Sequence, residues 1–227
     1  MRGVNVVIAG AHGKIARRLT RLLVAGHDRV GGIIRNPDHR HDISADGGDP
    51  ILCDLETASE GELDAAVVGA DAIVFAAGAG PGSGAARKDT VDYGAAKRLV
   101  DAARRTGVRR YVMVSAMGTD APPEGDDVFA VYLRAKARAD AELRAAGLDH
   151  TIVRPGGLTD DAGTGLVRID RHVAPGHVAR DDVAAVLAAA LGEPGTIGRT
   201  FEVVEGDTPI AAAVAAVEAH IELPDAS

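Results

Sequence analysis

The chain has 227 residues, enough for one α/β domain to bury its own core, and we expect a single domain over residues 1–227. Its 25 Lys and Arg against 33 Asp and Glu give a net charge of −8 without a basic, aromatic-interleaved stripe, which excludes nucleic acid as a main partner. One cysteine excludes an intrachain disulfide and a cysteine-based metal site, and no apolar run approaches the roughly 20 residues of a membrane span, so we expect a cytoplasmic protein with no metal.

Short β-branched runs alternate with Ala-, Leu- and Arg-rich segments of helical period. The run Val4–Ala9 predicts a buried strand, and the apolar spacing from Ile15 to Leu23 predicts a helix that ends at Gly26. This alternation is typical of a three-layer, doubly wound α/β fold with a mainly parallel sheet. The seven predicted strands cover residues 4–9, 29–34, 51–54, 72–76, 110–115, 150–154 and 200–204.

A glycine-rich turn, Gly10–Ala16, joins the first strand to the first helix. Glycines at such a turn let the backbone approach a pyrophosphate, and the first amides of the helix present partial positive charge to it. Because the turn lies between a buried strand and an amphipathic helix, it predicts a Rossmann-type dinucleotide site. The candidate cofactor ligands in this turn are Gly10, His12, Gly13, Lys14 and Ile15.

The residue that follows the second strand indicates which dinucleotide is bound. Sites selective for NAD place an Asp or Glu there for the ribose hydroxyls, and a 2′-phosphate would be repelled by it. This chain has Arg35 at that position, followed by Asn36 and Pro37. A guanidinium can bind a 2′-phosphate with two hydrogen bonds, so we predict NADP(H), with NAD(H) possible.

Four stretches interrupt the alternation. Asn36–Asp49 and Gly78–Lys88 are predicted to be loops, and the histidines of the first, His39–His41, are predicted to be solvated. Gly118–Asp127, with two prolines and four carboxylates, and Thr159–His177, with little helical period, are expected to border the substrate as a small C-terminal substrate region.

Helix ends follow two patterns later in the chain. Gly107 and Gly147 each come just before a predicted strand, where glycine commonly ends a helix. Asp181 and Asp182 precede an Ala-rich helical segment, and we expect them to cap its N-terminus.

Taken together, five motifs resemble the atypical, extended-type short-chain dehydrogenase/reductases over nearly the whole chain. The resemblance is closest to the compact NAD(P)H-binding branch of NmrA-like and biliverdin-reductase-B-like proteins, often labelled sugar epimerases. The motifs are Gly10–Ala16, Ile34-Arg-Asn-Pro, Cys53-Asp-Leu, Ser115-Ala-Met-Gly and Thr151-Ile-Val-Arg-Pro-Gly-Gly-Leu.

This resemblance implies cofactor contacts at the ends of several predicted strands. Ligands of doubly wound sheets bind beyond the carboxyl ends of the strands, where each of these residues is expected. The implied contacts are Asp54 and Leu55 with the adenine, Ala76, Ala77 and Gly78 with the adenosine ribose and phosphates, and Pro155 and Gly156 with the nicotinamide.

A catalytic centre is also implied by the resemblance. Tyr132 and Lys136 are four residues apart on a predicted helix and Ser115 ends a strand, which resembles the family's Ser and Tyr-x-x-x-Lys arrangement. In that mechanism Lys136 and the oxidised nicotinamide lower the pKa of the Tyr132 phenol, and Lys136 and Ser115 also contact the cofactor. The family's Asn on the preceding helix is missing, and Asp92 near that position is expected to be a first-turn carboxylate.

Three functions are compatible with these features. The leading hypothesis is an NADPH-dependent reductase of a small carbonyl, quinone or flavin-like acceptor, acting as a monomer or homodimer. The second is a sugar epimerase or isomerase that retains its nucleotide and uses the same three residues. The third is an NmrA-like regulator that senses NADP(H) without turnover, in which Tyr132 has no catalytic use.

Overall fold

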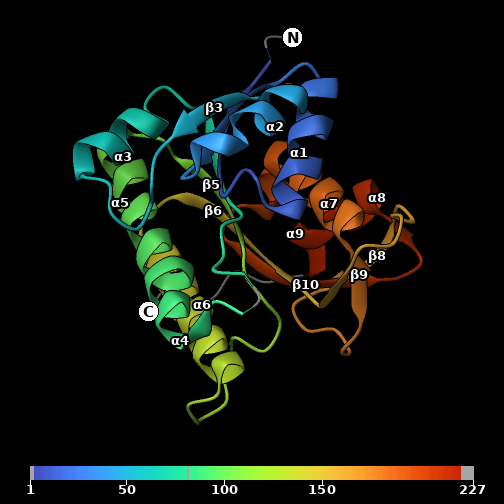
Figure 1. The fold of residues 1–227 in the computed structure, drawn as a ribbon. Helices are drawn as coiled ribbons and strands as arrows, with labels where there is room; N and C mark the ends of the chain where they lie inside the picture. Colours follow the sequence, from blue (N-terminus) through green and yellow to red (C-terminus); the bar gives the residue numbers. More distant parts are fainter. Residues whose placement is uncertain (1–2, 81, 221–227) are drawn as a thin grey trace.

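A nine-stranded sheet forms the centre of the computed structural model, which describes residues 3–80 and 82–220 (Figure 1). Its strands are β1 (Asn5–Ala9), β2 (Arg29–Ile34), β3 (Asp49–Leu52), β4 (Ala72–Phe75), β5 (Arg110–Val114), β6 (Asp149–Pro155), β8 (Leu166–Asp170), β10 (Arg199–Glu205) and β11 (Thr208–Pro209). Their order is β11-β8-β10-β6-β5-β4-β1-β2-β3. Pairing is parallel from β3 to β10, and β8 is antiparallel to both β10 and β11.

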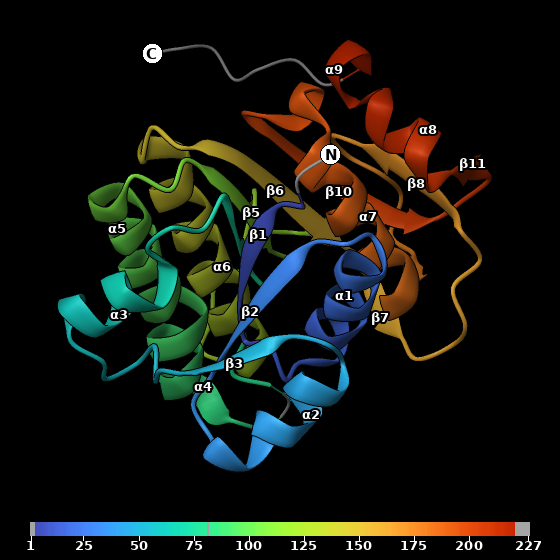
Figure 2. The same ribbon diagram turned by 90° about the horizontal axis from the view of Figure 1, so that it is seen from above.

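Helices cover both faces of this sheet, as Figures 1 and 2 show. On one face lie α1 (Lys14–Ala25), α7 (Arg180–Gly192) and α8 (Ile210–Ala215), and on the other lie α3 (Glu60–Val67), α5 (Ala96–Thr106) and α6 (Val128–Ala145). β1 shows how one strand serves two cores. Val6 and Ile8 pack into the first, and Val7 and Ala9 into the second, because side chains alternate along a strand.

Shorter elements complete the described chain. β7 (Gly157–Thr159) and β9 (His177–Ala179) form a separate parallel pair. The short helices are η1 (Pro37–His39), α2 (Arg40–Ala45), α4 (Gly84–Arg87), the π-helix η2 (Lys88–Ala95), η3 (Pro194–Thr196) and α9 (Val217–His220).

The predicted fold class is confirmed, and all seven predicted strands are present within one or two residues at their ends. The sheet has two strands more than predicted. Segment 159–177 contributes β8, whose Val167 is buried between exposed neighbours, and residues 208–209 add β11 beside it. The two predicted loops are partly helical. Asn36–Asp49 contains η1 and α2, since the Asn36 side chain caps η1, and Gly78–Lys88 contains α4.

The three helix ends predicted at glycines are confirmed, and the predicted cap of α7 is wrong. Gly107 and Gly147 have φ angles of 78° and 69°, in the left-handed region that glycine adopts without strain. α1 ends at Ala25 with Gly26 as its cap, but Gly26 has φ −79°, and the positive φ falls on His27. At the start of α7 the two carboxylates do not cap their own helix. Asp182 accepts hydrogen bonds from the Thr164 and Gly165 amides, and Asp181 pairs with α1.

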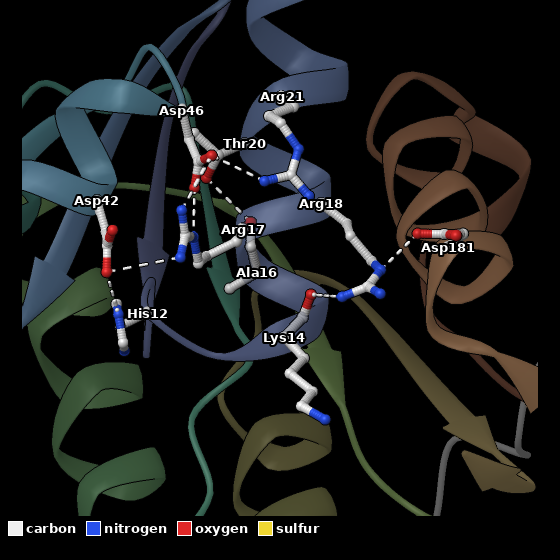
Figure 3. Close-up of polar contacts among 10 residues, drawn as sticks. All are labelled: His12, Lys14, Ala16, Arg17, Arg18, Thr20, Arg21, Asp42, Asp46 and Asp181. Carbon is white, nitrogen blue, oxygen red and sulfur yellow. Dashed lines mark hydrogen bonds and ion pairs between the residues drawn. The ribbon is translucent and has the colours of Figure 1, made fainter. Parts of the chain in front are cut away.

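Arginines on α1 connect that helix to the elements on either side (Figure 3). Arg17 Nε and Arg21 Nη1 donate to the two oxygens of Asp46, at 2.6 and 2.7 Å, just after α2. On the opposite side Arg18 pairs with Asp181 at the start of α7. The helix that follows the glycine turn is therefore fixed to two neighbours by charge as well as by packing.

Because Asp46 is buried between these guanidiniums, its charge should make stability depend on pH. Burial raises the pKa of the Asp46 carboxyl, but the hydrogen bonds from Arg17 and Arg21 outweigh it, and the net pKa lies below its ordinary value. A depressed folded-state pKa adds stability above the unfolded-state pKa of about 3.9, and this is lost as pH falls through the folded value.

We expect Asp46→Asn to lower the free energy of unfolding by about 1–3 kcal/mol at pH 7, with the difference from wild type shrinking below about pH 4. Urea unfolding at a series of pH values measures this difference. The exposed Asp161 supplies the control, since Asp161→Asn should change neither the stability nor its pH dependence. A difference for Asp46→Asn that stays constant from pH 7 to pH 3 contradicts the linkage.

Candidate functional site

A pocket of about 300 Å³ opens at the carboxyl ends of β1 to β4. In the sheet order, β1 lies between β2 and β4, so the chain leaves β1 at the point where strand order reverses. Doubly wound sheets bind their ligands at such a point. The pocket is lined by Gly10, His12, Gly13, Ile33, Ile34, Arg35, His39, Cys53, Asp54, Leu55, Glu56, Ala76, Ala77, Gly78, Ala79, Arg87, Val91 and Ala95.

Its floor is the glycine turn. Gly10 has φ 76°, and a Cβ added to it would lie 2.6 Å from the Ala77 Cα, so the backbones that follow β1 and β4 touch there. α1 begins immediately after Gly13, with no side-chain cap and no acidic residue in its first turn. The first backbone amides of α1 are thus available to bind an anion. The close backbone approach at Gly10 and these amides fit a dinucleotide pyrophosphate.

The turn is held from the side by an imidazole pair. The His12 ring stacks on the His39 ring, with centroids 3.5 Å apart and planes 8° from parallel. His12 Nε2 lies 2.8 Å from Asp42 Oδ2, and Figure 3 shows the two side chains facing each other. His39 lies in η1 and lines the pocket, so the prediction of a loop is wrong for it, whereas His41 on α2 is exposed as predicted.

Two of the five candidate cofactor ligands in the turn, Lys14 and Ile15, lie outside the pocket lining. Lys14 Nζ is 2.5 Å from Asp160 Oδ2, and Asp160 also pairs with Arg180 at 3.0 Å. This ion pair joins the start of α1 to the predicted substrate segment 159–177. The Ile15 side chain packs against the core beneath α1.

Residues that follow β2 and β3 line the end of the pocket where the adenosine was predicted to bind. Arg35 lines the pocket but pairs with Glu56, whose carboxylate lies 3.2 Å from Arg35 Nη1. β2 is followed by no acidic residue, as predicted. The turn after β3, however, places the carboxylate of Glu56 beside Arg35. Asp54 and the buried Cys53 also line the pocket, so Cys53 has a place in the site besides packing.

The residues of the predicted catalytic centre lie near the end of β5, outside the pocket lining. Lys136 Nζ donates to the Val114 carbonyl at 3.0 Å and lies 3.5 Å from Asp92 Oδ1, with both side chains buried. Ser115, next to Val114, is buried, and its hydroxyl has no hydrogen-bond partner among the described residues.

Asp92 lies in η2 and not in the first turn of α5, so that expectation is wrong. Its Oδ2 accepts a hydrogen bond from the Ala79 amide at 3.2 Å, while Oδ1 faces Lys136. Lys88, at the start of η2, donates to the Gly80 carbonyl at 2.8 Å and lies 5.2 Å from the centroid of the Tyr132 ring. The π-helix therefore connects the rim of the pocket to both Lys136 and Tyr132.

The environment of Tyr132 acts against ionisation. Burial raises the pKa of the Tyr132 phenol above its ordinary value, and the carboxylates of Asp92 and Asp140 raise it further. The ammonium group of Lys136 lies against Asp92 and the Val114 carbonyl, and the net effect on the phenol is a raised pKa in place of the expected lowering. At neutral pH the phenol keeps its proton.

The end of β6 anchors the substrate-side segments. Pro155 is buried, and a Cβ added to Gly156 would lie 2.4 Å from the Gly176 carbonyl oxygen, so only glycine allows this approach. Arg154 on β6 binds Asp140 on α6 and also Asp120, which lies in segment 118–127. Both predicted substrate segments are therefore fixed to the carboxyl edge of the sheet.

A family model described as NAD(P)H-binding matches residues 10–194, from the glycine turn to the residues that follow α7. The chain belongs to this NAD(P)H-binding family. The dinucleotide prediction and the resemblance to atypical short-chain dehydrogenase/reductases are confirmed at this level.

Relatives of this NAD(P)H-binding chain extend over most of its length. The "Uncharacterized sugar epimerase YhfK" of Bacillus subtilis (strain 168) is 37% identical over 212 residues, which cover 93% of this chain and 99% of that protein. A solved "Putative NAD-dependent epimerase/dehydratase" from Bacillus halodurans is 38% identical with a TM-score of 0.88, covering 93% and 99% of the two chains.

A second solved structure has the name of a reductase. "ChuY: An Anaerobillin Reductase" from Escherichia coli O157:H7 is 26% identical with a TM-score of 0.76, covering 89% of this chain and 98% of that one. The chain therefore belongs among reductase- and epimerase-like NAD(P)H-binding proteins. Within residues 3–80 and 82–220, no helix is both long enough and apolar enough to cross a membrane.

Proposed function

We propose that the chain is an NADPH-dependent reductase of a small carbonyl, quinone or flavin-like acceptor, with Tyr132 as its proton donor. The observation that carries this proposal is geometric: Tyr132 lies one helical turn from Lys136 on α6, and the buried Lys136 ammonium is 3.5 Å from Asp92 Oδ1. Reduction of a carbonyl adds a hydride to carbon and a proton to oxygen, and a phenol with a raised pKa holds that proton at neutral pH.

The pocket residues would hold the adenosine and pyrophosphate parts of the cofactor. The turn at Gly10 and Gly13 and the first amides of α1 would bind the pyrophosphate, and Arg35 would bind the 2′-phosphate. When bound, NADPH supplies the hydride. The pyrophosphate role is supported by the backbone contact at Gly10 and the uncapped start of α1, and the role of Arg35 by its place in the pocket lining.

At the acceptor, three side chains have separate tasks. Tyr132 donates its proton to the substrate oxygen. The Ser115 hydroxyl, which lacks a protein partner in the described chain, hydrogen-bonds the same oxygen. Lys136, held by Asp92 and the Val114 carbonyl, restores the proton to the phenol through its ammonium group.

A small acceptor is favoured over a large sugar nucleotide. The substrate-side segments are short, about residues 118–127 and 159–177, and the second of them includes β8 of the central sheet. The reductase name of ChuY also supports reduction of an acceptor over epimerisation of a sugar nucleotide. An epimerase that retains its nucleotide is the alternative, because two of the similar proteins have epimerase names.

Titration with NADPH, followed by assays of its oxidation with quinones, flavins and aldehydes, tests the proposal. A reductase consumes NADPH in proportion to the acceptor reduced. A protein that purifies with bound nucleotide, and interconverts sugar isomers without net consumption, contradicts the reductase proposal and supports the epimerase.

Arg35→Ala should show which dinucleotide the site prefers. We expect the Kd for NADPH to rise about 10- to 100-fold and the Kd for NADH to change less than about threefold, because charge-assisted hydrogen bonds to the phosphate are lost. Arg40→Ala removes an exposed charge nearby on α2, outside the pocket lining, and should change neither Kd. Equal weakening of both cofactors by Arg35→Ala contradicts the NADP(H) preference.

A further inference from the structure

A carboxylate lies between two guanidinium groups at the adenosine end of the pocket. Glu56 Oε2 accepts hydrogen bonds from Arg87 Nη2 at 2.6 Å and from Arg35 Nη1 at 3.2 Å. Its other oxygen, Oε1, accepts from the Thr90 hydroxyl at 2.7 Å. Arg35, Glu56 and Arg87 all line the pocket, although they come from the end of β2, the turn after β3 and the end of α4.

The group is charged at neutral pH. Burial raises the pKa of the Glu56 carboxyl, but the hydrogen bonds from Thr90 and Arg87 and the charges of both arginines outweigh it, so the net pKa lies below its ordinary value. The Glu56 side chain is 21% exposed, against 55% for Arg35 and 35% for Arg87. Two cations thus face the pocket with one anion between them.

The two nicotinamide dinucleotides make opposite demands on such a group. The ribose 2′-hydroxyl of NAD(H) is a donor, and a carboxylate is the acceptor that suits it. A phosphate monoester carries about −1.5 to −2 charges at pH 7, binds guanidinium groups and is repelled by a carboxylate. Arg35 and Arg87 therefore favour NADP(H), whereas Glu56 favours NAD(H).

We propose that Glu56 determines the cofactor selectivity of this chain at the ribose 2′ position. Its carboxylate accepts the 2′-hydroxyl of NAD(H) and, by occupying Arg35 and Arg87, limits the affinity for NADP(H). Arg87 is the second phosphate-binding side chain, and it becomes available when its hydrogen bond to the Glu56 carboxylate breaks. This inference rests on the dinucleotide site of the proposed function and adds the residues that set its specificity.

Direct binding measurements test the inference without any need for turnover. The chain contains no tryptophan, so the emission of bound NADPH or NADH is followed without indole emission. We expect Glu56→Gln, which keeps the shape of the side chain, to lower the Kd for NADPH about tenfold and to raise the Kd for NADH severalfold. Arg87→Met should raise the Kd for NADPH about tenfold and leave that for NADH within about twofold.

Glu60→Gln is the matched control. Glu60 is 80% exposed on α3, outside the pocket lining, so its substitution changes the net charge equally and should leave both Kd values within about twofold. An unchanged ratio of the two Kd values in Glu56→Gln, or equal weakening of both cofactors, overturns the role of Glu56. An unchanged NADPH affinity in Arg87→Met overturns the role of Arg87.

Failure of this inference can be distinguished from failure of the proposed function. If the wild type binds neither dinucleotide, both are overturned. If it binds them but none of the tested acceptors supports NADPH oxidation, only the reductase proposal is overturned. The ratio of the two Kd values then still decides the role of Glu56. Thermal unfolding of each variant, with a midpoint close to wild type, shows that the affinities belong to a folded chain.

Discussion

Tyr132→Phe should lower kcat for NADPH oxidation by about 10²- to 10⁴-fold while the Kd for NADPH stays within about twofold. The substitution removes only the hydroxyl, so the phenyl ring can keep its place near Lys88 and Phe129. The loss falls on proton donation because the raised pKa of the Tyr132 phenol keeps its proton in place at neutral pH. Steady-state kinetics with each accepted substrate, together with cofactor titration, measures the two effects separately.

Tyr93→Phe is the control for this variant. Tyr93 lies on η2, where its hydroxyl donates to Glu142 at 3.0 Å, and its removal should leave kcat within about twofold. Unchanged turnover of Tyr132→Phe on every substrate means that Tyr132 is not the donor. With NADP(H) binding intact and no turnover in the wild type, a sensing role would then fit better than an enzyme.

The second large effect concerns stability. Asp140→Ala should lower the free energy of unfolding by about 3–5 kcal/mol, because the buried guanidinium of Arg154 then keeps only one of its two carboxylate partners. Arg154 is 2% exposed, and its Nε and Nη2 both donate to Asp140 Oδ2, at 3.0 and 2.9 Å. The remaining partner, Asp120, is half exposed and binds only Nη1. Urea unfolding at pH 7 measures the loss.

An exposed ion pair provides the comparison. Arg109 and Asp149 lie 2.9 Å apart near the amino ends of β5 and β6, and their side chains are 64% and 38% exposed. Asp149→Ala should cost no more than about 1 kcal/mol, since water screens such pairs. If the two alanine variants lose similar amounts, the buried pair does not stabilise the fold as argued.

Much of the fold could be predicted because its signals are local. The run from Val4 to Ala9 predicts β1 since a strand buried on both faces needs consecutive apolar residues. The glycines at 10 and 13 predict the turn, and Gly10 shows why, since an added Cβ would lie 2.6 Å from the Ala77 Cα and leaves room for no other residue there. The sequence signal for β8 is weaker. Val167 is buried between exposed neighbours, an alternation that is typical of an antiparallel strand with one face exposed to solvent.

The parts of the site that could not be predicted depend on contacts between distant segments. Glu56 follows the adenine-side pair Asp54 and Leu55 in sequence, but nothing local shows that its carboxylate reaches Arg35 and Arg87. Similarly, the stack of His12 on His39 joins two segments 27 residues apart. The π-helix begins in a stretch whose glycines and serine predict a loop, and its hydrogen bonds to Glu56 and Ala79 form only in the folded chain.

The strands at the two ends of the central sheet have a consequence for the folded chain at high concentration. The outermost described strands are β3 and β11, and each contains a proline, Pro50 and Pro209. A proline has no amide hydrogen to offer a neighbouring strand, and edges of this kind resist the strand-to-strand stacking that leads to aggregates. If two copies of this protein associate, their helical faces and loops are better suited to the contact than a sheet that continues from one copy into the next.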